Sequence, residues 1–206
     1  MDNIINNLNE QQKDVLKEIG NIGAGNAVSA LAEFLNKEIK MTVPGVKMLP
    51  ISEVPAITGD AAQNVFGVLF YVTGDLTANI LFLLTETSVK YLIRLLFGRE
   101  VKLAEITEME ISAIKEVGNI ISSAYLTTLN ELTGFDFNKS VPGFSRDMAG
   151  ALLSETLISL EDSSDYILYI ETWFRDDIRE IDSYFLLLPE RQALLKLLRA
   201  LGIDVQ

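Results

Sequence analysis

A short phrase occurs twice in this chain: KEIGNIGAGNA begins at Lys17, and KEVGNIISSAY begins at Lys115, 98 residues later. Aligning residues 17–45 with residues 115–143 without a gap gives ten identical pairs. Residues 80–98 match residues 184–202 at an offset of 104, so the second half carries a net insertion of six residues between its matching parts. The chain is therefore predicted to contain two copies of one unit, over about residues 9–98 and 107–202.

The two units are expected to share one core. The chain has 206 residues, of which 49% are hydrophobic, and a chain of this size can bury a large apolar core. No Gly-, Ser- or Pro-rich linker separates the units. Because such a linker usually marks a domain boundary, we expect residues 1–206 to form a single domain.

The first unit reads as a helix, then strands, then a second helix. The spacing of apolar residues predicts a helix over 9–35 with Asn9 as its N-cap. A strand from Glu38 to Val43 is expected to stop at Pro44-Gly45. Hairpin strands over 65–72 and 76–84 follow, and then a helix over 86–97 closed by Gly98.

The second unit repeats this order. Its predicted elements are a helix over about 107–132, strands over 135–141, 165–174 and 180–188, and a helix over about 190–201 closed by Gly202. The additional segment 145–161 reads as an amphipathic helix. Since hairpins dominate over strand–helix–strand alternation, we expect an α+β fold with an antiparallel sheet.

Composition excludes several kinds of chemistry. The chain contains no cysteine and no histidine, which rules out Ser-His-Asp and Cys-His relays, thiolate nucleophiles, and zinc sites built on His or Cys. With 17 basic and 29 acidic residues, the net charge is −12, and no Lys/Arg cluster offers the positive surface that nucleic-acid binding needs. We therefore expect no nucleic-acid partner.

The sequence offers no sign of export or of membrane insertion. No apolar run approaches the ~20 residues of a membrane helix, and the longest runs, NILFLL and YFLLLP, are the length of a strand. The polar start MDNIINNLNEQQ lacks the pattern of a signal peptide, and a chain without cysteine has no disulfide framework. A cytoplasmic location is the expectation that follows.

The repeated phrase places a carboxylate and a carboxamide on the same side of each long helix, because residues three apart share a helix face. Both halves follow the pattern [Asp/Ser]-x3-Glu-x2-Asn-x22-Pro. The residues are Asp14, Glu18, Asn21 and Pro44 in the first half, and Ser112, Glu116, Asn119 and Pro142 in the second.

One such Glu–Asn pair is typical of a solvated helix face and has no diagnostic value alone. Core positions differ between the two helices, as in the pairs Gly23/Ile121 and Ala27/Tyr125, while the Glu, the Asn and the distant Pro are retained. Solvated faces usually diverge faster than cores, so this retention indicates a functional role for the motif.

The glycines of GNIGAG, residues 20–25, resemble a phosphate-binding loop. Such loops follow a strand and open a helix, whereas this segment lies inside a helical pattern, and its later glycines become Ile121 and Ser123 in the second copy. We reject a nucleotide site and expect close packing against a neighbouring element instead.

A carboxamide both donates and accepts hydrogen bonds, so it can hold a water molecule in one orientation. In phosphoryl transfer, positioning the attacking water and placing charge can suffice for catalysis. A carboxylate one turn away can pair with a lysine of a partner and set its orientation. The residues are suited to this chemistry, although they do not identify the substrate.

The doubled motif resembles that of the CheC/CheX/FliY family of bacterial chemotaxis phosphatases, and the resemblance covers essentially the whole chain. It implies hydrolysis of the aspartyl phosphate of the response regulator CheY by a pseudo-twofold α+β domain with both motif helices exposed on one side. By this resemblance, Asn21 and Asn119 orient the attacking water, and Glu18 and Glu116 engage a lysine of CheY.

The resemblance also implies supporting residues and partners. Asp14 and Ser112 would support the motif, and Pro44 and Pro142 would shape the strand end beneath it. Mg²⁺ would be held by CheY, so no cofactor or metal site is expected in this chain, which we expect to be a monomer. The receptor-modifying deamidase CheD would be a second partner, with 145–161 as the candidate surface.

Three other functions compete with this one. A non-enzymatic switch or scaffold module would share the fold and lack the Glu–Asn pairs. An adaptor would serve mainly to sequester CheD. A metal-dependent hydrolase would need a carboxylate cluster with ligand spacing, and the sequence contains no convincing one.

Overall fold

The computed structural model describes residues 9–36, 40–57, 59–160, 162–175 and 180–203. The helices are α2 (Glu10–Leu35), α3 (Glu86–Phe97), α4 (Glu108–Thr133), α5 (Ala149–Ile158) and α6 (Arg191–Ala200), with short 3-10 helices η1 (Ile51–Ala56) and η2 (Leu103–Glu105). The strands are β1 (Lys40–Pro50), β2 (Asn64–Gly74), β3 (Ala78–Thr85), β4 (Phe137–Lys139), β5 (Gly143–Met148), β6 (Tyr166–Arg175) and β7 (Glu180–Pro189).

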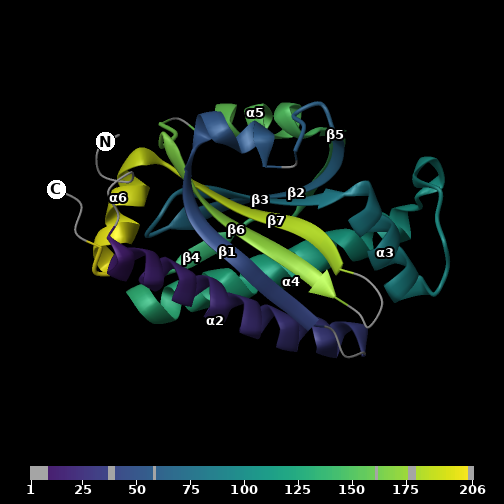
Figure 1. Ribbon diagram of the computed structural model, residues 1–206, viewed down its shortest axis with the longest axis horizontal. Coiled ribbons are helices and arrows are strands. Elements are labelled where there is room, and N and C mark those ends of the chain that lie inside the picture. Colours follow the sequence, from purple (N-terminus) through teal and green to yellow (C-terminus); the bar gives the residue numbers. More distant parts are fainter. Residues whose placement is uncertain (1–8, 37–39, 58, 161, 176–179, 204–206) are drawn as a thin grey trace.

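These elements form three layers. The long helices α2 and α4 cover one face of the sheet, and α5 lies on the opposite face (Figure 1). Every strand pairing is antiparallel, and the order is β1-β6-β7-β3-β2-β4, with β5 also paired to β2. The predicted α+β class with an antiparallel sheet is confirmed.

The two halves of the chain interlock within this sheet. The first strand of the first half, β1, pairs with β6 of the second half. Conversely, β4 and β5 of the second half pair with β2 of the first. Each half therefore adds strands to the hairpin of the other, β2–β3 in the first half and β6–β7 in the second.

The centre of the sheet carries the symmetry of the repeat. In the pairing of β3 with β7, Leu81 lies opposite Leu186, and Phe82 lies opposite Phe185. The repeat offset of 104 residues aligns Leu81 with Phe185 and Phe82 with Leu186. Exchanging the two halves of the chain therefore turns one of these cross-strand pairs into the other. A pseudo-twofold axis thus passes between these pairs, in agreement with the predicted internal duplication.

Both faces of the central strands are apolar because the sheet is covered on both sides. Along β3, Ile80 and Phe82 pack in the cluster that contains the apolar faces of α2 and α4. Leu81 and Leu83, which point the other way, pack with Leu152 of α5. The period of two along the strand therefore divides the core into two layers.

The two long helices begin at matching caps. The Asn9 side chain accepts a hydrogen bond from the Gln12 backbone, and the Gln12 side chain accepts one from the Asn9 backbone. Thr107 and Glu110 form the same reciprocal arrangement at the start of α4. Such capping boxes satisfy amide groups that have no partner within the helix. The predicted helix over 9–35 with Asn9 as its N-cap is confirmed.

The strand after α2 was wrongly predicted to stop at Pro44-Gly45. It continues as β1 to Pro50, with a shift of pairing register between Thr42 and Gly45. Because β1 lies at the edge of the sheet, an irregularity there accommodates a proline, which has no amide hydrogen to donate. The predicted start at 38–39 lies outside the described residues.

The second half also differs from prediction. The strand expected over 135–141 is only Phe137–Lys139, and the chain forms a further strand, β5, after Pro142. The helix expected over 145–161 is strand up to Met148 and helix only over Ala149–Ile158. Pairing of β5 along β2 takes up the start of this segment, from Asn64 opposite Met148 to Leu69 opposite Gly143.

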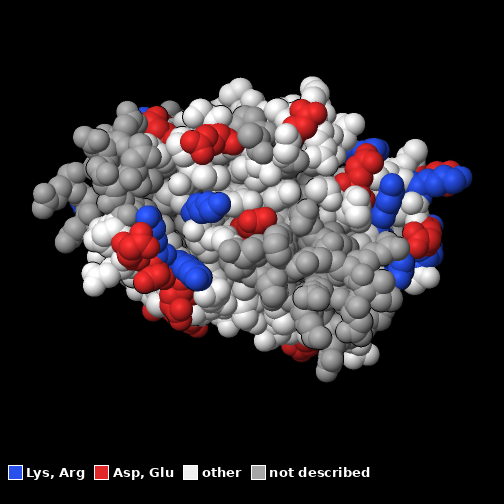
Figure 2. All heavy atoms as spheres, in the orientation of Figure 1, with Lys and Arg blue, Asp and Glu red and all other residues white. Residues whose placement is uncertain are grey.

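The surface mixes charges of both signs. Figure 2 shows acidic and basic side chains interspersed on one face of the molecule. Several form ion pairs, such as Arg191 with Asp165 at 2.7 Å and Lys196 with Asp75 at 3.1 Å. Among the described residues, no helix combines the length and the apolar character required to cross a membrane.

Candidate functional site

The helices α2 and α4, which carry the two motifs, pack against each other in opposite directions (Figure 1). The Asn26 amide of α2 donates a hydrogen bond to the Thr128 hydroxyl of α4 at 3.2 Å. Leu132, near the end of α4, lies in one hollow with Ile19, near the start of α2. This arrangement brings the first motif near the end of α4 and the second motif near the C-terminal half of α2.

One glycine in each long helix allows a neighbouring element to pack closely against it, α4 against α2 at Gly23 and β2 against α4 at Gly118. A β-carbon at Gly23 would overlap the Tyr125 ring, and one at Gly118 would lie 3.0 Å from Val68 of β2. A β-carbon at Gly25 would meet nothing within 4 Å. The packing explanation for GNIGAG therefore holds for Gly23 and fails for Gly25, and the segment lies within α2 rather than at the start of a helix.

The first motif lies on the solvent side of α2. Asp14, Glu18 and Asn21 are exposed, while Leu16 and Ile19 are buried beneath them. Glu18 borders a shallow hollow of about 200 Å³ formed with residues of α4 and α6. In the described part of the chain, no hydrogen bond joins Glu18 to Asn21.

The second motif is more enclosed. Ser112 is exposed, but Glu116 and Asn119 are half-buried on α4. The Asn119 amide nitrogen lies 3.4 Å from each carboxylate oxygen of Glu116, so the structure brings these two predicted residues together. Asn119 also borders a groove of about 420 Å³ between α4 and α2, which Asn26 and Ser123 also line.

The two motifs line different hollows. Glu18 borders the hollow near the end of α4, whereas Asn119 borders the groove along the C-terminal half of α2. Residues of both helices contribute to each hollow. The molecule therefore presents two separate Glu–Asn sites rather than one composite site.

The two motif prolines lie in the strand regions. Pro44 belongs to β1 at the shift of register, and Pro142 is half-buried between β4 and β5. Pro142 is not among the residues that line the hollows of Glu18 and Asn119. The supporting role of both prolines, like that of Asp14 and Ser112, stays a prediction.

Sequence reasoning missed a lysine behind the second motif. The Lys139 ammonium on β4 donates hydrogen bonds to the Asn119 carbonyl at 2.8 Å, the Ser122 hydroxyl at 2.7 Å and the Ser123 hydroxyl at 2.6 Å. Burial lowers the pKa of Lys139 from 10.5 to about 8, and the Glu116 carboxylate partly offsets this effect. The sequence signal was available, because the repeat aligns Lys139 with Met41 and so marks it as a difference between the halves.

A metal centre has no visible basis in the described residues, where no group of three or more acidic side chains is placed to hold an ion. The side chains that meet at the second motif are a carboxylate, a carboxamide, two hydroxyls and a lysine. Such groups can orient a water molecule and bind charge, but they offer no strong nucleophile.

Comparison with known proteins places these sites in a family context. The profile of the CheC-like family matches residues 12–48 and 109–146, two segments that together contain both motifs. The chain is 36% identical to the CheY-P phosphatase CheC of Bacillus subtilis over 207 residues, covering 98% of this chain and 99% of the relative.

Solved structures share the fold. The crystal structure of Thermotoga maritima FliY has a TM-score of 0.75 at 22% identity, covering 95% of this chain and 98% of that one. CheX in its complex with CheY, BeF3 and Mg²⁺, from Borrelia burgdorferi, has a TM-score of 0.51 at 19% identity, covering 85% and 97%. With a relative this similar over nearly its whole length, and with both motifs inside the matched segments, the chain belongs to the CheC-like family.

Proposed function

We propose that this protein is a phosphatase that hydrolyses the aspartyl phosphate of CheY in the cytoplasm. The observation that carries the proposal is the contact of Asn119 with Glu116 on a helix face that borders an open groove. The similarity to the CheY-P phosphatase CheC supports the choice of substrate. The similarity to CheX, solved in complex with CheY, supports the same partner.

In the proposed mechanism, the carboxamide of Asn119 or Asn21 holds a water molecule in line with the phosphorus–oxygen bond of the acyl phosphate. The amide can accept a hydrogen bond from this water or donate one to it, so it fixes the orientation without removing a proton. Positioning of this kind is a large part of catalysis in phosphoryl transfer, where the transition state requires little covalent help from the enzyme.

Glu116 and Glu18 have a different role in this proposal. Their carboxylates pair with a lysine of CheY, and this charge-assisted contact orients the regulator over the neighbouring amide. Mg²⁺ belongs to the substrate, because CheY brings it together with the phosphoryl group. The chain itself needs only to place two polar side chains against the phosphorylated surface.

The openness of both sites suits a protein substrate. Small-molecule sites are usually concave pockets that enclose most of the ligand. Here Glu18 and Asn21 are exposed, and the groove beside Asn119 lies open between two helices. A phosphoryl group carried on the surface of another protein could reach both sites without an opening step.

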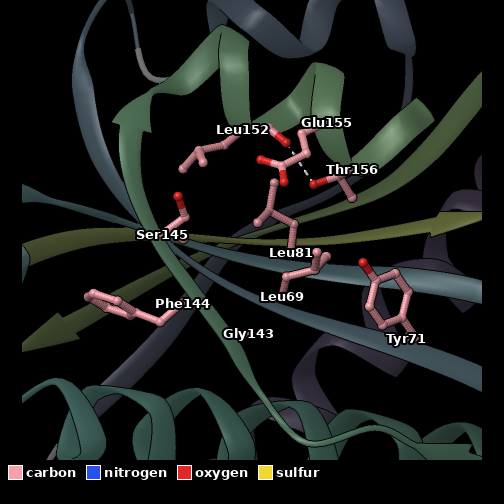
Figure 3. Close-up of a pocket in the computed structure, with 10 residues that line it drawn as sticks. Leu69, Tyr71, Leu81, Gly143, Phe144, Ser145, Leu152, Glu155 and Thr156 are labelled. Atoms are coloured by element: carbon pink, nitrogen blue, oxygen red, sulfur yellow. Dashed lines mark hydrogen bonds between the residues drawn. The ribbon is translucent and has the colours of Figure 1, made fainter. Parts of the chain in front are cut away.

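CheD is the second partner in this proposal, with the region of α5 as its surface. Ile158 of α5 is 83% exposed, and Met148 immediately before the helix is 46% exposed. A cavity of about 230 Å³ also lies between α5 and the sheet, and Figure 3 shows Leu152 of α5 above Leu69 and Leu81, which line it. Exposed apolar side chains are suited to hold a partner on the face opposite the two motif helices.

The direct test follows the amount of phosphorylated CheY over time, with and without this protein at a substoichiometric concentration. Faster loss of phosphate, with several CheY molecules turned over per phosphatase molecule, supports the proposal. Binding of CheY without faster loss would instead support the switch or scaffold alternative.

The adaptor alternative has its own test. A variant with both Asn21→Ala and Asn119→Ala is added to CheD, and deamidation is measured. If this variant inhibits CheD stoichiometrically, sequestration of CheD is a function separate from catalysis. Loss of the inhibition would count against a purely adaptor role.

A further inference from the structure

Lys139 joins the edge strand β4 to the middle of α4, directly behind the second motif. Its ammonium contacts three oxygen atoms: the Asn119 carbonyl, the Ser122 hydroxyl and the Ser123 hydroxyl, at 2.6–2.8 Å. The same ammonium lies 4.7 Å from the centre of the Phe70 ring on β2, a cation–π distance. The lysine is therefore fixed from both sides, by α4 and by the sheet.

These contacts determine how Lys139 can act. A lysine ammonium has three N–H donors, and here three acceptors occupy them. No donor is left for a phosphoryl group while these bonds persist. Lys139 must therefore act on the site through α4 rather than by contact with the substrate.

Residue 119 is consequently held at two points. Lys139 holds its backbone carbonyl, and Glu116 lies 3.4 Å from its side-chain amide. Ser123, which also contacts Lys139, borders the same groove as Asn119. The lysine thus fixes the stretch of α4 from which the amide projects into the groove.

The sequence of the first half lacks the three residues that form this arrangement. The repeat aligns Lys139 with Met41, Ser122 with Ala24, and Ser123 with Gly25. Since α2 folds into a helix of the same length without the two hydroxyls, and with methionine aligned to the lysine, the fold does not require them. Burying a charged ammonium carries a desolvation cost even when its hydrogen bonds are satisfied, so an apolar residue can serve the fold at least as well at such a position.

We propose that Lys139 is a positioning residue of the second site, which orients Asn119 through the backbone of α4 and has no counterpart in the first site. This inference rests on the proposed function, because the reaction it serves is the hydrolysis attributed to the Glu–Asn pairs. The two sites of the molecule are then unequal: the second is held in its working geometry before the substrate arrives, and the first is not.

The experiment separates the two sites by mutation. Asn21→Ala leaves only the second site, and Asn119→Ala leaves only the first. Each background is combined with Lys139→Met, which introduces the residue of the first half, and with Lys139→Arg, which keeps the charge. The decay of phosphorylated CheY is measured as a function of CheY concentration, so that kcat and KM are obtained separately.

In the Asn21→Ala background, Lys139→Met is expected to lower kcat on the order of tenfold with KM unchanged, because small displacements of a positioned group slow the chemical step. Lys139→Arg should recover part of this loss. In the Asn119→Ala background, neither substitution should change the rate. Hydrogen exchange should accelerate at the amides of residues 119–123 in Lys139→Met, but not at the aligned residues 21–25 of α2.

Three outcomes would overturn the inference: an unchanged kcat in the Asn21→Ala background, an equal loss in both backgrounds, or an Asn21→Ala protein without activity. The equal loss would mean that Lys139 serves the fold as a whole. Failure of the proposed function is recognised separately, because the variant lacking both Asn21 and Asn119 would then be as active as the unmodified protein.

Discussion

The Asn119 amide nitrogen lies 3.4 Å from both carboxylate oxygens of Glu116, one helical turn earlier on α4. The free protein therefore holds the two polar groups of the second motif together, and under the proposed mechanism a lysine and the phosphoryl group of CheY would replace this contact. In the first motif, the side chains of Glu18 and Asn21 are exposed. The Glu and Asn side chains are thus in contact with each other in the second motif and exposed to solvent in the first.

The glutamates are expected to act in docking rather than in the chemical step. Replacing both Glu18 and Glu116 with Gln should raise KM for phosphorylated CheY about tenfold, equivalent to ~1.4 kcal/mol, and leave kcat nearly unchanged. The variant should also be less sensitive to salt, since an ion pair would be lost. Steady-state rates at two salt concentrations test this.

A matched control for the glutamates is Glu155→Gln, which removes an exposed carboxylate on α5, across the sheet from the motif helices. It should leave both constants unchanged. A fall in kcat at unchanged KM in the Glu18 and Glu116 variant would assign these residues to catalysis instead.

The contact of Gly23 with Tyr125 predicts an unequal effect of two neighbouring Gly→Ala substitutions. Gly23→Ala should destabilise the protein by about 1–3 kcal/mol, because the new methyl group must displace a buried ring. Gly25→Ala meets open space and should stabilise α2 by up to about 1 kcal/mol. Unfolding in denaturant measures both, and equal effects would mean that the helices do not pack as described.

Glu110 predicts an acid-sensitive contribution to stability. Burial alone would raise the pKa of Glu110, but hydrogen bonds from Thr107 and the guanidinium of Arg99, 2.6 Å away, hold the pKa below its ordinary value of 4.5. A carboxyl whose pKa is lower in the folded state stabilises the protein above its unfolded pKa, and this contribution is lost as the pH falls.

Glu110→Gln should therefore lower the free energy of unfolding by about 1 kcal/mol at pH 7. The gap to the unmodified protein should shrink once the pH falls below the ordinary value of 4.5. Glu108→Gln, on the same first turn but exposed, is the control and should have a smaller effect. A gap that stays constant with pH would contradict the proposed ion pair.

Lys139 predicts a destabilising contribution that is relieved at alkaline pH. Burial lowers the pKa of Lys139 to about 8, from the 10.5 expected in the unfolded chain. Between these two values the unfolded chain carries a proton that the folded protein has lost, so raising the pH favours folding. The unmodified protein should gain stability relative to Lys139→Met as the pH rises from about 8 to 10.5, and parallel stability curves would refute the shift.

The sequence predicted the features that depend on local pattern. Helix α2 follows from apolar spacing and the Asn9 cap, and the β2–β3 hairpin follows from two apolar runs around Thr73-Gly74-Asp75. The proximity of Glu116 and Asn119 follows from their separation of three residues on a helix. The α+β class was predictable because these local signals repeat in both halves.

Features that depend on contacts between elements were not predictable in the same way. The strand β5 is mostly exposed and half of its residues are polar, so only its pairing with β2 distinguishes it from the start of the predicted helix. Met148, which precedes α5, makes no side-chain cap bond that could mark the boundary. Lys139 escaped notice because its partners are on another element, 16–20 residues away along the chain.

The measurement that tests the central claim most directly is the decay of phosphorylated CheY with the unmodified protein, with Asn21→Ala, with Asn119→Ala and with both substitutions together. If the two amides orient the attacking water, each working site should lose on the order of 10²-fold in rate, as for other positioned catalytic groups, and the double variant should leave CheY to decay at its own rate. If the double variant accelerates decay as well as the unmodified protein does, the two Glu–Asn pairs are not catalytic sites.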